Sequence, residues 1–320
     1  MDERRPGSRA GVIARAGRRA AGASRASGAT AGGELTIGAL VHELACTLGS
    51  GTAEEIRREA RDIVAAVADA PRLWPVTHAA ELADRHIVAR ARTAAERRRR
   101  GMPFAYAVGR AAFRHLTLEV DERVLIPRPE TEVLVDLVLS ATGGGAGLAI
   151  DVGTGSGAIA LALATEGRFE RVVGTDVSAD ALVVAAANAR RVAGPGAAPT
   201  EFRLGAYLAP VRGLTARAIV SNPPYISYAE APSLPSSVRA WEPPVALLAG
   251  DDGLATTAAI VAQSAAILEA GGVLAFEVDS RRAGACAALV ARDARYAGVM
   301  VRQDLTGRDR FVTATRSNRS

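Results

Sequence analysis

The sequence predicts an α/β fold in which a parallel sheet with helical crossovers follows a small helical section and a β-hairpin. Three patterns lead to this prediction. From about residue 130 to the C-terminus, short apolar runs alternate with helical stretches. Before residue 100, apolar side chains recur at helical spacing in residues 37–44, 63–67 and 82–88. Residues 104–126 alternate apolar and polar side chains, which is typical of a hairpin.

Breaks in these patterns predict four sections. We expect a disordered basic leader over residues 1–33, a helical N-terminal domain over 34–102, a β-hairpin linker over 103–129 and the sheet domain over 130–320. Within the sheet domain, apolar runs predict core strands at residues 148–152, 171–175, 218–220 and 271–278. Two further runs, at residues 299–301 and 311–313, predict a closing antiparallel hairpin.

The net positive charge is confined to the leader. Residues 1–33 contain seven arginines and two acidic residues, which accounts for the whole net charge of +5 and leaves the rest of the chain neutral. The Ala, Gly, Ser and Arg content of the leader predicts disorder, and a mitochondrial transit peptide is the alternative. Because the catalytic body is neutral, we expect no direct binding of nucleic acid.

Cysteine content and hydropathy indicate the compartment. Cys46 and Cys286, the only two cysteines, lie far apart and lack metal-ligand spacing, so we expect neither a disulfide framework nor a metal site. The most apolar windows, residues 145–164 and 254–276, are interrupted by charged or polar side chains, so we expect no membrane span. These features favour the cytoplasm.

The most informative motif is Asn222-Pro223-Pro224-Tyr225, directly after the predicted strand at residues 218–220. Two prolines fix φ and remove two backbone donors, which leaves a rigid corner with free carbonyls. Asn222 adds a carbonyl acceptor and an NH2 donor, and Tyr225 adds a flat apolar face. This set suits a planar group that carries an NH2, such as a carboxamide or a nucleobase. We predict that Asn222, Pro223 and Tyr225 are catalytic, and that Pro224 contacts the substrate with them.

A glycine-rich loop follows the predicted strand at residues 148–152 and leads into a helix. Glycine suits a backbone with positive φ or one that approaches a ligand closely. The next strand ends in Asp176, at the spacing where an acidic side chain holds a ribose diol. The glycines alone also fit a nicotinamide cofactor, but with Asp176 and the Asn222 motif they favour S-adenosyl-L-methionine. The predicted cofactor contacts are Asp151, Gly153, Thr154, Gly155, Ser156, Gly157, Asp176 and Asn222.

Over about residues 34–315 the chain resembles the protein-(glutamine-N5) methyltransferases that modify peptide chain release factors. The strongest marks are the motif at residues 222–227, the loop at residues 151–157, and the segment Leu125-Ile126-Pro127-Arg128-Pro129-Glu130-Thr131-Glu132. The resemblance implies the seven-stranded, Rossmann-like sheet of class I S-adenosylmethionine-dependent methyltransferases, with a helical N-terminal domain for substrate docking. It further implies a monomer that methylates the glutamine in the Gly-Gly-Gln motif of release factors, which act in translation termination.

Several positions depart from the family pattern. Gly205-Ala206-Tyr207 stands where an acidic residue and a bulky apolar one are usual near the adenine; Tyr207 is expected to cover the ring, without the acidic partner. A strand that commonly ends in Glu-Ile-Gly reads Glu277-Val278-Asp279. These departures bear on cofactor affinity and substrate docking. A different protein glutamine therefore stays open as the acceptor.

Other side chains allow two interpretations. Asp151 either orients the glycine loop or contacts the methionine amine of the cofactor. Asn188 is expected to be a polar residue on a helix surface. Arg128 is predicted to contact the substrate, and it either holds the linker or pairs with Glu130.

Two further functions remain open. The Asn222 motif also suits a methyltransferase acting on a nucleobase NH2, although the neutral body argues against it. A binding protein that has lost activity is the other alternative, against which the intact Gly153, Asp176 and Asn222 argue.

Overall fold

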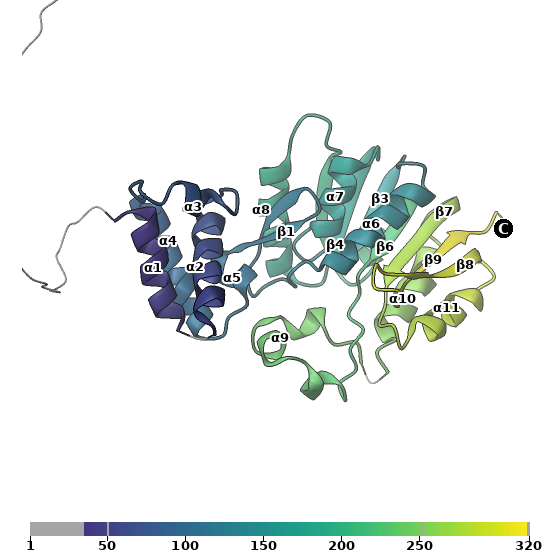
Figure 1. The fold of residues 1–320 in the computed structure, drawn as a ribbon. Coiled ribbons are helices and arrows are strands. Elements are labelled where there is room, and N and C mark those ends of the chain that lie inside the picture. The colour runs from purple at the N-terminus through teal and green to yellow at the C-terminus, as the bar shows by residue number, and fades with distance from the viewer. Residues whose placement is uncertain (1–34, 50, 251, 319–320) are drawn as a thin grey trace, which may run out of the picture. The chain divides into compact units, whose positions relative to one another are not determined.

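Seven strands form one sheet, as predicted (Figure 1). In spatial order they are β5 (Thr200–Leu204), β4 (Arg171–Asp176), β3 (Leu148–Val152), β6 (Ala216–Ser221), β7 (Leu268–Glu277), β9 (Asp309–Arg316) and β8 (Tyr296–Gln303). The first five strands of this order are parallel, and β9 runs antiparallel to both of its neighbours. The predicted core strands and the closing hairpin are therefore confirmed.

The computed structural model describes residues 35–318, apart from Ser50 and Asp251. The predicted basic leader, residues 1–33, lies outside this range. Within the described residues, no helix combines the length and apolar character that a membrane span requires.

Helices cover both faces of the sheet, because successive strand residues point to opposite sides. On β3, Ala149 belongs to the apolar cluster of one face and Ile150 to that of the other. The helices of the first face are α6 (Pro129–Ala141), α7 (Ala158–Glu166) and α8 (Ala179–Val192). The helices of the second face are α10 (Ala255–Ser264) and α11 (Ala283–Ala291).

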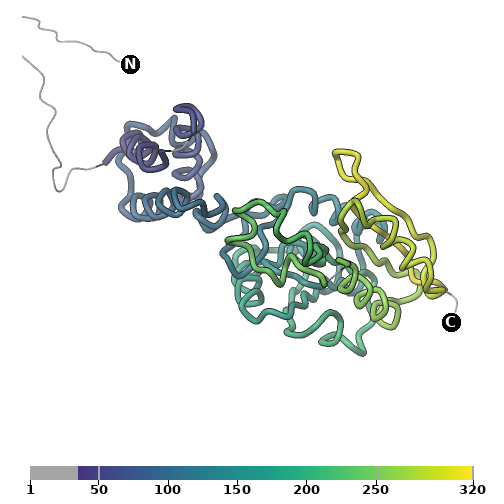
Figure 2. Tube along the Cα trace, turned by 90° about the horizontal axis from the view of Figure 1, so that it is seen from below, coloured from purple at the N-terminus to yellow at the C-terminus, as the bar shows by residue number. Residues whose placement is uncertain are grey.

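The N-terminal helices bury Leu40, Leu44 and Ile63 in an apolar cluster that also includes Ala181 and Val184 of α8. Figure 2 shows the N-terminal helices as purple and blue coils. They are α1 (Ile37–Leu48), α2 (Ala53–Ala68), α3 (Trp74–Thr77), α4 (Arg85–Arg99) and α5 (Phe104–Val108). Leu82 was expected on a helix but precedes α4, because Asp84 is the N-cap of that helix; the Leu82 side chain is exposed.

The predicted hairpin is shorter than the alternating pattern suggested. Strands β1 (Arg110–Phe113) and β2 (Leu116–Glu119) pair antiparallel. Residues 104–108 instead form α5, which Gly109 ends with a left-handed φ of 75°. Tyr106 of α5 is buried, and its hydroxyl donates to the Val124 carbonyl at 2.6 Å. An aromatic residue at this position therefore reflects packing of a helix rather than alternation along a strand.

A long connection joins β6 to α10, and its last part returns to pair with its first part. A bridge between Ile226 and Leu248 closes its base. Along it lie η2 (Ala231–Ser233), α9 (Ser236–Trp241) and η3 (Pro244–Ala246); a further short helix, η1 (Ala209–Val211), precedes β6. Trp241 packs against the apolar core of the N-terminal helices. This connection carries the Asn222 motif at its start, so its fold determines how that motif is held.

Candidate active site

A cavity of about 330 Å³ opens at the carboxyl ends of β3, β4 and β6. The chain order reverses between β3 and β6, since β4 and β5 lie on one side and β7 on the other. Parallel sheets bind their ligands at such a switch point, because the strand ends leave a crevice there. Gly155, Asp176 and Asn222, each following or ending one of the three strands, line this cavity together.

The glycine loop leaves free space on the cavity side. Gly153 and Gly155 have left-handed φ values of 74° and 55°, which favour glycine. A side-chain carbon built on either residue would meet no atom of the described residues within 4 Å. A ligand therefore has close access to this backbone, which leads into α7 through Gly157.

Asp176 ties the glycine loop to the end of β4. One carboxylate oxygen accepts from the Gly155 N–H at 2.9 Å, and the other accepts from the Ser178 N–H at 2.9 Å. Asp176 is half-buried and lines the cavity. Each oxygen keeps a lone pair for a further donor, such as a ribose hydroxyl.

Asp151 lies fully buried behind the loop and does not line the cavity. Its Oδ2 accepts from the Thr154 hydroxyl at 2.7 Å and from the Ala160 N–H at 3.1 Å. Among the described residues, its Oδ1 has no hydrogen-bonding partner. Burial raises the pKa of Asp151 to about 7. Of the two interpretations open from the sequence, these contacts support the one in which Asp151 orients the loop.

Tyr207 lines the same cavity as Gly153 and Gly155, and it was predicted to cover the adenine. Its backbone has a left-handed φ of 51°, and its carbonyl accepts from the Thr175 hydroxyl at 2.8 Å. The half-exposed side chain of Val177 adds an apolar wall. The adenine contact of Tyr207 stays a prediction.

The Asn222 motif is held by side chains from two other elements. Asn222, Pro223 and Pro224 line the cavity, whereas Tyr225 lies behind them. The Asn222 Nδ2 donates to the Thr131 hydroxyl at 3.1 Å, and the Tyr225 hydroxyl donates to Glu277 at 3.4 Å. Burial raises the pKa of the Tyr225 phenol and also that of the Glu277 carboxyl.

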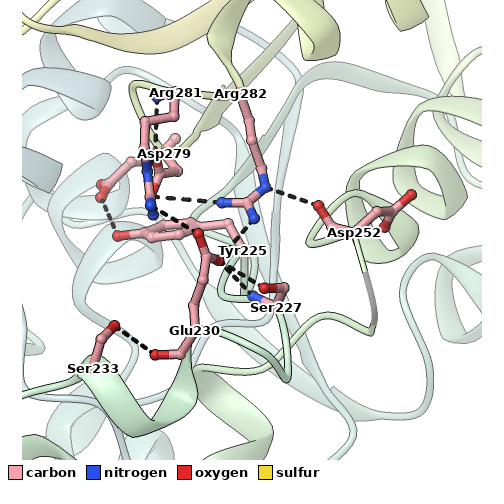
Figure 3. A network of polar contacts seen from close by, with 9 residues as sticks. Tyr225, Ser227, Glu230, Ser233, Asp252, Asp279, Arg281 and Arg282 are labelled. Carbon is pink, nitrogen blue, oxygen red and sulfur yellow. Dashed lines mark hydrogen bonds and ion pairs between the residues drawn. The ribbon is translucent and has the colours of Figure 1, made fainter.

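An ion network fixes the chain just beyond the motif (Figure 3). Glu230 accepts from the Ser227 N–H at 3.0 Å and from Arg282 at 2.7 Å, and it lies 2.8 Å from Arg281. Hydrogen bonding to Arg282 lowers the pKa of Glu230 to about 2. Asp279 accepts a bidentate pair from Arg281 at 2.9 and 2.7 Å. The network joins the β6–α10 connection to the start of α11.

Arg128 does not pair with Glu130, which corrects one interpretation left open by the sequence. Its Nη2 donates to both carboxylate oxygens of Glu242, at 2.6 and 2.7 Å. The Glu242 side chain is only 2% exposed, so the pair ties the proline-rich segment to the β6–α10 connection. Arg128 does not line the cavity, and its contact with a substrate stays a prediction.

Asn188 is fully buried rather than on a helix surface, so that expectation was wrong. Its amide exchanges hydrogen bonds with the Glu119 backbone at 2.6 and 2.9 Å and donates to the Ser156 carbonyl at 2.9 Å. Asn188 thus joins the hairpin, the glycine loop and α8. The small side chains of Ala187 and Ala189, which allow close packing around Asn188, were the sequence feature that could have indicated its burial.

The structure divides the predicted site residues into two groups. Those on the cavity wall are Gly153, Gly155, Asp176, Tyr207, Asn222, Pro223 and Pro224. Those behind the wall are Asp151, Thr154, Ser156, Gly157, Tyr225 and Arg128. Wall residues that the sequence did not predict include Leu125, Val245 and Ile260. In the part of the chain that the structure describes, no group of three metal-ligating side chains converges.

Comparison with known proteins identifies the family. The model of the Methyltransferase small domain matches residues 129–233. A release factor glutamine methyltransferase from Moorella thermoacetica is 38% identical over 70% of this chain and 78% of its own length. One from Deinococcus radiodurans is 40% identical over 72% of this chain and 80% of its own. The chain belongs to the release factor glutamine methyltransferase family.

The structural comparison agrees at the level of the fold. The hMettl16 catalytic domain, solved in complex with MAT2A 3'UTR hairpin 6, gives a TM-score of 0.51 at 16% identity, over 73% of this chain and 82% of that chain. The chain thus has the class I, Rossmann-like fold. As a member of the release factor glutamine methyltransferase family it is a methyltransferase whose cofactor is S-adenosylmethionine. The open backbone at Gly153 and Gly155 and the free lone pairs of Asp176 fit this cofactor.

Proposed function

We propose that this enzyme transfers a methyl group from S-adenosylmethionine to the side-chain amide nitrogen (N5) of the glutamine in the Gly-Gly-Gln motif of peptide chain release factors. One observation carries the proposal: the Asn222-Pro223-Pro224 corner lines the same cavity as Gly155 and Asp176. A rigid group of carbonyl acceptors thereby lies beside the place of the methyl donor.

The corner is suited to a carboxamide. The amide nitrogen of glutamine is a poor nucleophile, because its lone pair is delocalised into the carbonyl. We assign the Asn222 Oδ1 and the Pro223 carbonyl as acceptors of its two hydrogens. Both hydrogen bonds strengthen as the nitrogen becomes positive, and fixed dipoles of this kind stabilise a transition state. Tyr225 lies behind this corner, so we assign it the support of the corner rather than contact with the amide, and its raised pKa keeps the phenol neutral.

Positioning supplies the remainder of the rate enhancement. When bound, the cofactor supplies a sulfonium-activated methyl group. The amide nitrogen gains a bond to the methyl carbon while the carbon–sulfur bond breaks, sulfur keeps the bonding pair, and one amide proton leaves to water. Holding the reactants in line contributes up to about 7–11 kcal/mol. The assigned wall residues for the cofactor are Gly153, Gly155, Asp176 and Tyr207, with Asp151, Thr154, Ser156 and Gly157 supporting the loop from behind.

The domain division is part of the proposal. Residues 34–102 form the docking domain for the release factor, residues 103–129 the linker and residues 130–320 the catalytic domain. The packing of Trp241 against the N-terminal helices supports a shared surface for the protein substrate. We further infer that the enzyme acts as a monomer in the cytoplasm, where release factors are found.

Methyl transfer to purified release factor tests this function. Radiolabelled methyl groups should appear in wild-type release factor, and mass spectrometry should place them on the Gly-Gly-Gln glutamine. A release factor with that glutamine replaced by alanine is the matched control and should stay unlabelled. Label in the alanine variant would point to a different protein glutamine. Label in total RNA or DNA in its place would support the nucleobase alternative.

A further inference from the structure

Two buried side chains stand behind Asn222 in a chain of hydrogen bonds. The Asn222 Nδ2 lies 3.1 Å from the Thr131 Oγ1, and the Thr131 Oγ1 lies 2.6 Å from the Glu277 Oε2. Thr131 is 4% exposed and Glu277 is 2% exposed. The three residues come from the start of α6, the end of β7 and the connection after β6. Water has little access to this chain of contacts.

The direction of these hydrogen bonds follows from the number of protons. Glu277 accepts on both oxygens, from the hydroxyls of Thr131 and Tyr225, as an ionised carboxylate does. An ionised carboxylate only accepts, and a threonine hydroxyl has a single hydrogen. At 2.6 Å from Glu277 that hydrogen is donated to the carboxylate, so toward Asn222 the Thr131 oxygen offers only lone pairs. The group of Asn222 that faces Thr131 must then be its NH2. The carbonyl oxygen of Asn222 is therefore turned away from Thr131.

This direction matters because an asparagine amide does not select its own orientation. Its terminal torsion is broad and roughly two-fold, so the oxygen and the NH2 can exchange places at little cost. With the NH2 toward the substrate, two donors would face each other, and the acceptor for the amide hydrogen would be lost.

We propose that Thr131 and Glu277 are positioning residues that fix the Asn222 amide with its oxygen toward the substrate. The inference rests on the proposed function, in which that oxygen accepts an amide hydrogen. Glu277 also receives the Tyr225 hydroxyl on its other oxygen, at 3.4 Å. One buried carboxylate thereby orients both polar side chains of the motif.

Substitution of Thr131 tests this role against a merely structural one. Thr131→Val keeps the shape but removes the hydroxyl, and it should lower the single-turnover rate of methyl transfer about 10- to 100-fold. Cofactor affinity should change less than about twofold, because Thr131 does not line the cavity. Thr131→Ser restores the hydroxyl and should recover most of the rate. Equal rates for the Val and Ser variants, or a loss confined to cofactor affinity, would overturn the proposal.

A second threonine supplies a matched control. Thr313 on β9 is 8% exposed, and its hydroxyl has no partner among the described residues. Thr313→Val should leave the rate unchanged. A rate loss equal to that of Thr131→Val would indicate a general effect of losing a hydroxyl and would overturn the proposal.

Two further variants complete the test. Should Thr131→Val fail to fold, Glu277→Gln keeps the side-chain length. It should lower the rate about two- to tenfold, because its NH2 can reverse the direction of the hydrogen bonds; an unchanged rate would contradict the proposal.

In the Asn222→Ala background, Thr131→Val should cause no further loss of the methyl-transfer rate. No methyl transfer to release factor by the wild-type enzyme would refute the proposed function itself. An inactive Asn222→Ala beside a fully active Thr131→Val would refute the positioning role alone.

Discussion

Asp176 and Gly155 are joined by a hydrogen bond of 2.9 Å from the Gly155 N–H to the Asp176 Oδ2. The end of β4 and the loop after β3 thus form one rigid unit on the cavity wall. The acid has two tasks, since it shapes the loop and offers lone pairs to a ligand.

Asp176→Ala should weaken the binding of S-adenosylmethionine about 10- to 100-fold, because a charge-assisted hydrogen bond contributes about 1.5–3 kcal/mol. Isothermal calorimetry measures the dissociation constant directly. Asp180→Ala is the control, because Asp180 is exposed in the first turn of α8 and does not line the cavity. Equal affinities for the two variants would remove Asp176 from the cofactor site.

Asp151 predicts a pH dependence of stability. Its pKa rises from 3.8 to about 7 on folding, so the folded state holds the proton more tightly than the unfolded state. The stabilisation of the fold by protonated Asp151 is therefore largest below pH 4 and is lost as the pH rises to 7. The roughly 3-unit shift corresponds to a swing on the order of 4 kcal/mol.

Asp151→Asn, which keeps an acceptor for Thr154 and Ala160, should therefore become more stable relative to wild type as the pH rises from 4 to 7. Urea unfolding of both proteins at several pH values measures the difference, and contributions of other titrating groups cancel in it. A difference that is constant with pH would show that Asp151 titrates normally.

Arg128→Met should destabilise the fold by about 1.5–3 kcal/mol, because it leaves the buried Glu242 carboxylate without its bidentate partner. Adding Glu242→Gln should recover much of the loss. Arg123→Met is the comparison, since Arg123 pairs with a carboxylate that is 41% exposed and should contribute less than about 1 kcal/mol. Similar losses from both arginines, measured by chemical unfolding, would mean that burial of Glu242 does not matter.

Arg282→Gln should loosen the β6–α10 connection, because Glu230 loses one of its two arginine partners and the Asp252 carbonyl loses a donor at 2.8 Å. Hydrogen exchange should accelerate in residues 226–250 and stay unchanged in β3. The exposed Arg292 at the end of α11 gives the matched variant Arg292→Gln, which should leave exchange unaltered. Unchanged exchange in Arg282→Gln would exclude the network as the clamp of this segment.

The sheet was predictable because its central strands are buried on both faces and read as continuous apolar runs. The meeting of Gly155, Asp176 and Asn222 was also predictable, since the carboxyl ends of neighbouring parallel strands lie at one edge of a sheet. Residues 104–108 were misread, because the apolar side chains of α5 fit an alternating pattern over so few residues.

The contacts behind the wall were not predictable from local sequence. Glu242 lies 114 residues from Arg128, and Glu277 lies 146 residues from Thr131. Asn188 reaches Glu119 across 69 residues. Each of these side chains looks like an ordinary surface residue in its own segment. Burial and a distant partner together give it a role, and both arise only when the chain folds.

The single-turnover rate of methyl transfer to release factor by Asn222→Ala, measured with cofactor affinity, tests the central claim most directly. Loss of a fixed acceptor costs on the order of 10²–10³ in rate. We predict that loss, with cofactor affinity within a few-fold of wild type. Methyl transfer at the wild-type rate would contradict the assignment of Asn222 and the account of catalysis built on it.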